Sequence, residues 1–147
     1  MTALLHRLAM FFKREKVDSL ESFSLKISAM RFALHYEAVC EGQEVSITVS
    51  NPYVSEDKEE YSITRFKQEI GSFIDLLNEC NLMNWDGFQG KHPRGVKDGV
   101  MFSMSAVVNG GRTIRASGSE NFPKGYSELE KALYRMMKDS QNPDSNL

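Results

Sequence analysis

The residues best suited to acid–base chemistry gather in one glycine-rich segment, residues 84–98. Asp86, His92 and Asp98 belong to the types that accept and donate protons near neutral pH. Glycines in the segment would let its backbone approach a phosphate closely. Three basic side chains there could hold an anion, namely Lys91, Arg94 and Lys97. The segment therefore suggests a small enzyme, or a protein that binds phosphate or another anionic ligand.

The same segment also has a simpler interpretation. Both Asp86 and Asp98 are followed by glycine, and such pairs are common in turns. His92 precedes Pro93, which favours an extended backbone at the histidine. No nucleophile stands at a recognisable spacing from these residues, so catalysis by Asp86, His92 and Asp98 is the weaker hypothesis.

Aromatic residues in two loops favour a binding surface instead. The loop 117–125 leads into a helix, and if it lies beside residues 84–98 the aromatic side chains of both loops share one surface. Exposed aromatic and arginine residues are typical of protein-binding hot spots, and aromatic rings can also stack on nucleic-acid bases. Burial of all the aromatic rings is the alternative. The predicted binding residues are Trp85, Phe88, Lys91, Arg94, Phe122 and Lys124.

Familiar catalytic and cofactor motifs are missing from the sequence. It has no Walker-type phosphate loop, no GxGxxG, no HExxH and no GxSxG. Its three histidines, His6, His35 and His92, do not stand at metal-ligand spacing. We therefore expect no metal and no cofactor.

Two cysteines, Cys40 and Cys80, lie forty residues apart and form no CxxC pair. We expect both to be buried free thiols. No stretch resembles a secretory signal, and together these features predict a protein of the reducing cytoplasm.

Composition sets the broad class. The 147 residues carry 18 Lys and Arg against 20 Asp and Glu, and 41% are hydrophobic. This composition is too apolar for a disordered chain, and no apolar run reaches the ~18 residues that span a bilayer. A dedicated nucleic-acid binder usually has a basic excess, which is absent here.

Residues 3–16 fit an amphipathic helix with an apolar stripe. Three partners are possible for that stripe: the body of the domain, a second copy in a homodimer, or an anionic membrane surface. Packing on the body is favoured, and the membrane contact is the weaker alternative. The stripe comprises Leu4, Leu5, Leu8, Phe11 and Phe12.

The remaining elements follow from hydrophobic periodicity. Alternation predicts strands within 22–50, with a hairpin turn at Gly42, and a second hairpin over 100–117 that turns at residues 109–111. An apolar stripe predicts a helix over 66–80, capped by Thr64 and stopped near Asn81. Ser127 and Glu130 form a capping-box pattern that opens the last helix, which ends near 138.

The element order α-ββ(β)-α-ββ-α predicts an α+β fold. We expect one antiparallel sheet of about five strands with helices packed on one face. The predicted divisions are an N-terminal helix over 1–16, a domain over 20–138 and a polar tail over 139–147. The leading functional hypothesis is a non-enzymatic protein-interaction or regulatory module that binds through the loops 84–98 and 117–125.

Overall fold

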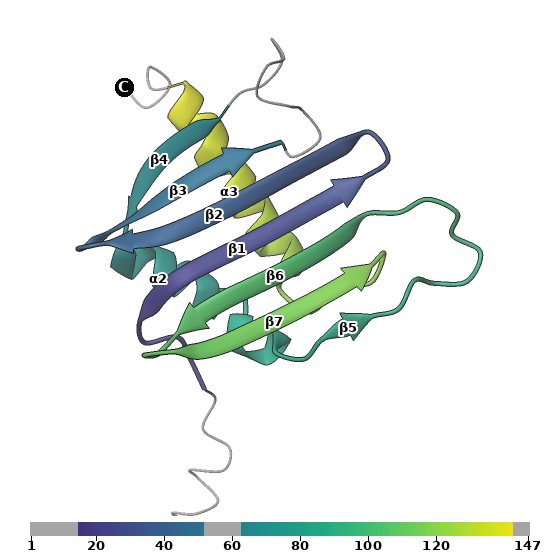
Figure 1. The fold of residues 1–147 in the computed structure, drawn as a ribbon, viewed down its shortest axis with the longest axis horizontal. Coiled ribbons are helices and arrows are strands. Elements are labelled where there is room, and N and C mark those ends of the chain that lie inside the picture. Colours follow the sequence, from purple (N-terminus) through teal and green to yellow (C-terminus); the bar gives the residue numbers. More distant parts are fainter. Residues whose placement is uncertain (1–14, 52–62, 143–147) are drawn as a thin grey trace, which may run out of the picture.

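Seven strands form a single sheet, and two α-helices lie behind it (Figure 1). The computed structural model describes residues 15–51 and 63–142. The strands are β1 (Leu20–Ala29), β2 (Phe32–Glu41), β3 (Glu44–Ser50), β4 (Thr64–Glu69), β5 (Gln89–Gly90), β6 (Met101–Val108) and β7 (Arg112–Ser119). The helices are α2 (Ile70–Glu79), a 3-10 turn η1 (Leu82–Trp85) and α3 (Tyr126–Gln141).

The α+β class is confirmed, but the prediction of about five antiparallel strands was wrong. The order across the sheet is β4-β3-β2-β1-β6-β7-β5, and β5 runs parallel to β7. The two additional strands are at the sheet edges, where β4 precedes α2 and the two-residue β5 follows η1. Residues 3–14 of the predicted helix over 3–16 lie outside the described residues, and so does the acidic stretch 55–60, which the sequence predicts to be a loop. Glu15 and Lys16 are described and belong to no helix.

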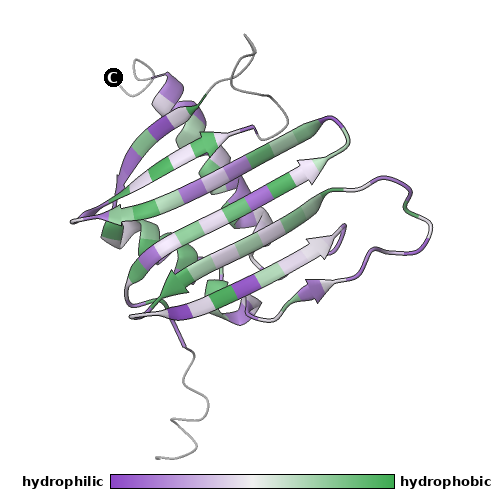
Figure 2. Ribbon diagram, viewed as in Figure 1, coloured by the Kyte–Doolittle hydropathy of each residue, from purple (hydrophilic) through white to green (hydrophobic). Residues whose placement is uncertain are grey.

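Alternating side chains explain the central strands. In β1, Phe23, Leu25 and Ile27 are buried, whereas the intervening Lys26 is exposed. The pairing of β1 with β2 places Leu25 opposite Tyr36, so the apolar faces of both strands coincide. Figure 2 shows the resulting alternation of hydrophobic and hydrophilic residues along the strands.

Strand β4 corrects the predicted helix over 66–80. Residues 64–69 alternate in period two, and Phe66 pairs with Ile47 of β3, so its ring reaches the core from a strand. Thr64 is therefore not a helix cap. The helix begins at Ile70, where the spacing of Phe73 and Leu77 becomes helical.

Glu69 caps α2 in place of Thr64. Its carboxylate accepts hydrogen bonds from the backbone N–H groups of Gly71 and Ser72, each at 2.9 Å, and from the Ser72 hydroxyl. These bonds lower the pKa of Glu69. A Cβ atom at Gly71 would lie 2.9 Å from Glu69 Oε1, so this glycine makes room for the cap. The predicted stop near Asn81 is confirmed, because α2 ends at Glu79 and Asn81 adopts the left-handed conformation.

The start of α3 also differs from the prediction. The residue that precedes the helix is Gly125, not Ser127, and no side chain caps it. Gly125 has a φ of +93°, and a Cβ atom there would lie 2.0 Å from the carbonyl oxygen of Cys80. Backbone contact between the loop and the end of α2 therefore decides where α3 begins, and the capping-box pattern does not reveal that contact.

The core lies between the sheet and the helices. Leu129, Leu133 and Met137 of α3 are buried, as its stripe predicts. Within the described ranges no helix is long and apolar enough to cross a membrane. Both cysteines are free thiols. Cys80 is buried and its pKa is raised to about 11 by that burial, whereas Cys40 is partly exposed, contrary to the expectation of full burial.

Candidate functional site

The two loops singled out in the sequence meet in space. The Ser117 N–H donates to the carbonyl of Phe88 at 3.0 Å, and the Gly87 N–H donates to the carbonyl of Arg115 at 2.9 Å. Further along, the Asn121 side-chain amide donates to the Lys91 carbonyl at 3.3 Å. The condition for a shared surface is thus met.

Glu120 fixes the corner between β7 and the second loop. It has a φ of +48°, which is uncommon for a residue with a side chain. Its N–H donates to the Val100 carbonyl, and its carboxylate accepts the Val100 N–H in return. A Cβ atom at Gly99 would lie 2.1 Å from Glu120 Cγ, so the glycine admits this side chain. The corner is therefore a built feature that holds the end of β7 against the start of β6.

The aromatic surface is not formed as predicted, because Trp85 is only 1% exposed. Its indole N–H donates to the carbonyl of Lys124 at 2.9 Å and also contacts that of Cys80 at 3.2 Å. Phe88 and Phe122 are half-buried, and both rings pack on Phe102. Trp85 therefore belongs to the core, and the rings of Phe88 and Phe122 are only partly exposed to solvent.

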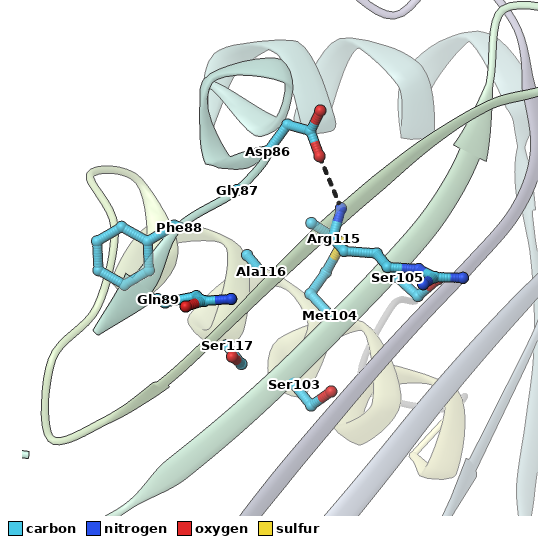
Figure 3. A pocket seen from close by; sticks show the side chains of 10 residues that line it. All are labelled: Asp86, Gly87, Phe88, Gln89, Ser103, Met104, Ser105, Arg115, Ala116 and Ser117. Atoms are coloured by element: carbon cyan, nitrogen blue, oxygen red, sulfur yellow. Dashed lines mark hydrogen bonds between the residues drawn. The ribbon is translucent and has the colours of Figure 1, made fainter. Parts of the chain in front are cut away.

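A first hollow of about 550 Å³ lies over β6, β7 and β5 (Figure 3). Asp86 borders it, and its carboxylate accepts the Arg115 N–H at 3.1 Å. The Arg115 side chain extends toward Ser105 in Figure 3. Asp86 therefore helps to hold the segment before β5 on the sheet edge, and it borders a different hollow from His92 and Asp98.

A second hollow of about 520 Å³ lies at one end of the sheet. It contains His92 and Asp98, so two of the three candidate acid–base residues share a cavity and Asp86 does not. Register brings strand residues from distant parts of the chain to the same place, because Ser28 pairs with Met101 and Met101 pairs with Ser119. The lining residues are Ser28, Ala29, Met30, His92, Lys97, Asp98, Gly99, Met101 and Ser119.

Ser28, Met30 and Met101 were not among the predicted site residues, and Ser119 was predicted only as part of the loop 117–125. They stand on three strands and one turn, and only the β1–β6–β7 register brings them together. The turn-forming run Gly118-Ser119-Glu120-Asn121 was visible in the sequence. The strand residues that line the hollow with it, Ser28 and Met101, were not.

Both ring nitrogens of His92 are engaged. Nδ1 lies 2.8 Å from Ser119 Oγ, and Nε2 contacts the carbonyl oxygen of Val96. A carbonyl only accepts, so Nε2 carries the hydrogen, and Nδ1 of the neutral ring accepts the Ser119 hydroxyl. The imidazole is thereby held between β7 and the loop.

Exposed apolar side chains gather at the end of the sheet that holds the second hollow. The described residues include six exposed large hydrophobic side chains, and four of them belong to this end of the sheet. Met30 is 72% and Met101 52% exposed, and both line the hollow. In Figure 1, the β1–β2 turn and the loop between β5 and β6 lie at this same end. We name this surface the end patch; it comprises Met30, Phe32, Val96 and Met101.

Basic residues accompany the end patch. Arg31 stands between two patch residues in the β1–β2 turn and is exposed. Lys91, Arg94 and Lys97 are exposed in the loop that carries Val96. Lys124 instead borders a third, smaller hollow with Phe88 and Phe122. Of the predicted basic binding residues, Lys91 and Arg94 therefore belong to the loop of the end patch, and Lys124 lies elsewhere.

No group of three or more His, Cys, Asp or Glu side chains with metal-binding geometry occurs within 15–51 and 63–142. Comparison with protein-family models and with curated proteins finds no match for the chain.

Proposed function

We propose that this protein is an interaction module that binds a protein partner through the end patch. The observation that carries the proposal is the gathering of four exposed apolar side chains at one end of the sheet, where two of them, Met30 and Met101, line a hollow. Single scattered apolar residues on a surface would need no explanation, but a group of them does. Methionine suits such a surface because its flexible, polarizable side chain adapts to a partner.

The charge around the patch indicates the chemistry of the partner. Arg31 and Lys97 are exposed beside patch residues in the chain, and Lys97 lines the hollow together with Asp98, its acidic lining residue. Two more basic residues, Lys91 and Arg94, are exposed in the loop that carries Val96. Complementary potentials steer association and favour the matching partner. The module would therefore bind a protein segment that carries acidic residues beside apolar anchors.

The enzyme built on Asp86, His92 and Asp98 is supported less well. Such an enzyme would need the three side chains to converge within hydrogen-bond distance of one another or of a common substrate. Asp86 borders the first hollow and bonds to the backbone of β7, whereas His92 and Asp98 border the second. A shared acid–base centre for these three residues is thus disfavoured.

A cytoplasmic location is part of the proposal. Cys40 and Cys80 are free, and Cys40 is partly accessible. Accessible unpaired thiols persist most readily in a reducing compartment. A homodimer remains a second form of partner for the same module, and membrane contact through residues 3–16 remains the weaker alternative.

A matched pair of variants tests the module. The double variant Met30→Asp, Met101→Asp adds two acidic groups to the end patch, and Val39→Asp adds one at an exposed position, 53% accessible, on β2. Each tagged protein is used to capture partners from cells that express it, and bound proteins are quantified by mass spectrometry. Circular dichroism checks that all three proteins are folded.

We expect the parent chain and Val39→Asp to capture at least one acidic protein. The amount of that protein captured by the double variant should be at least tenfold lower. Its retention by the double variant would contradict the proposal. Enrichment of the chain's own untagged copy, lost in the double variant, would instead identify the patch as a homodimer contact.

A further inference from the structure

We propose that Ser119 and His92 form a nucleophile–base pair that cleaves activated acyl esters in the second hollow. The inference uses the interior of the hollow and does not depend on a protein partner at its rim. It replaces the Asp86–His92–Asp98 set with a pair that the sequence alone did not reveal.

The hydrogen bonds have the order that nucleophilic catalysis requires. Ser119 Oγ lies 2.8 Å from His92 Nδ1, and Nε2–H donates to the Val96 carbonyl. The Val96 carbonyl thus leaves Nδ1 free to accept the serine proton, as the orienting group does in a catalytic triad. A backbone carbonyl takes the place of the usual carboxylate, so the imidazolium receives weaker charge stabilisation.

Both groups are held by the fold. Ser119 is the last residue of β7 and pairs with Met101, and the left-handed Glu120 turns the chain away directly after it. Strained backbone next to a reactive group is a recurrent feature of active sites. His92 is fixed from both sides, by β7 and by its own loop, so little reorganisation is needed before reaction.

The hollow offers room and charge for a small ester. Its volume of about 520 Å³ accommodates a small acyl group, and Met30 and Met101 give it apolar walls. Lys97 also lines the hollow, and its ammonium group supplies positive charge to an oxyanion that develops there. The substrate class that fits is an ester with a short acyl chain and a good leaving group.

The reaction is a two-step hydrolysis. Ser119 Oγ attacks the carbonyl carbon while its proton passes to His92 Nδ1, and the tetrahedral intermediate collapses as the C–O bond to the leaving group breaks. The leaving alkoxide takes the proton from His92. Water then attacks the acyl-serine with His92 as base, which releases the acid and restores the Ser119 hydroxyl.

A second serine–histidine contact provides an internal control. On β1 and β2, Ser24 Oγ lies 3.0 Å from His35 Nε2, and Glu37 contacts that same nitrogen at 3.3 Å. The Ser24 hydroxyl and the Glu37 carboxylate therefore compete for the same nitrogen of His35. In the Ser119–His92 pair, by contrast, the serine and the orienting carbonyl contact different ring nitrogens. Ser24→Ala is the matched variant.

The test uses p-nitrophenyl acetate for turnover and a fluorophosphonate probe for covalent labelling. We expect the full chain to be labelled on Ser119, as located by peptide mass spectrometry. Ser119→Ala and His92→Gln should each lower the hydrolysis rate about 100-fold, and Ser24→Ala should leave it unchanged. Ser119→Cys, which keeps a nucleophile, should retain formation of an acyl adduct.

Unchanged turnover in folded Ser119→Ala, or labelling at any other residue, overturns the inference. If Ser119→Ala does not fold, the hydrolysis rate of His92→Gln and the position of the fluorophosphonate label on the parent chain test the inference instead. Partner capture by the Met30, Met101 double variant is measured separately, so failure of this activity and failure of the interaction module are distinguishable.

Discussion

Single hydrogen bonds decide what each candidate residue can do. The carboxylate of Asp86 accepts a hydrogen bond from the Arg115 N–H, and that of Glu120 accepts one from the Val100 N–H. The carboxylate of Glu69 accepts hydrogen bonds from N–H groups at the start of α2. His92 differs, because the hydroxyl that it contacts, that of Ser119, lines the same hollow as the imidazole itself. The acidic residues therefore mainly stabilise the backbone, and His92 is the candidate with chemistry left to perform.

Two buried phenols give the first prediction. The hydroxyls of Tyr36 and Tyr126 have no hydrogen-bond partner in the described part of the chain, and burial raises the pKa of both. An unsatisfied buried polar group costs free energy, so Tyr36→Phe should leave the free energy of unfolding unchanged or raise it by about 1 kcal/mol. Urea denaturation measures this, and a loss of more than about 1 kcal/mol would reveal a partner for the hydroxyl.

Glu69 gives a prediction with a pH dependence. Hydrogen bonds from Ser72 and Gly71 lower its pKa below the usual 4.5, so its contribution to stability is present above that pH and lost as the pH falls through the folded-state value. Glu69→Ala should lower the melting temperature by a few degrees at pH 7 and make little difference near pH 2. Thermal melts of both proteins across pH check this, and a constant difference would argue against the cap.

At the scale of elements, Gly125 governs how α3 begins. Gly125→Ala should destabilise the fold by at least about 3 kcal/mol, because the new Cβ would collide with the Cys80 carbonyl. Gly110→Ala is the control: its φ is also positive, but nothing lies within 4 Å, so it should cost only about 1–2 kcal/mol. Urea denaturation compares the two, and equal losses would show that the contact with Cys80 does not matter.

Local patterns predicted the hairpins well, and tertiary contacts caused the failures. The turn at 109–111 is confirmed, because Asn109, Gly110 and Gly111 all have positive φ. Strand β4 was missed because the apolar stripe of α2 extends back to Phe66 by chance and hides the alternation of a sheet edge. The start of α3 was missed because it depends on Cys80, forty-five residues earlier.

The candidate site shows the same division. Its loop residues His92 and Asp98 were visible by type, since glycine and proline mark the segment as irregular. Ser119 and Met30 could not be placed beside them without the strand register, which a single sequence does not give. Burial of Trp85 likewise depends on Lys124 and Cys80 carbonyls that fold around its indole.

At the scale of the whole molecule, the chain has a covered and an open sheet face. Helices occupy one face, and the other carries small hydroxyl side chains in register, such as Ser24 opposite Ser105 and Ser103 opposite Ser117. The end patch interrupts this polar surface at one end of the sheet. Near-neutral net charge thus conceals a basic, apolar end, which is where a partner is expected.

Site-specific photocrosslinking tests that central claim most directly. A photoreactive phenylalanine analogue is placed at Met30 in the end patch or at Tyr134 on α3, which is also exposed, and the protein is irradiated in cells. We expect a discrete adduct with an acidic protein at position 30, absent at position 134 and lost when Lys97→Glu is added. Equal adducts at both positions, or none at position 30, would contradict a partner-binding role for the end patch.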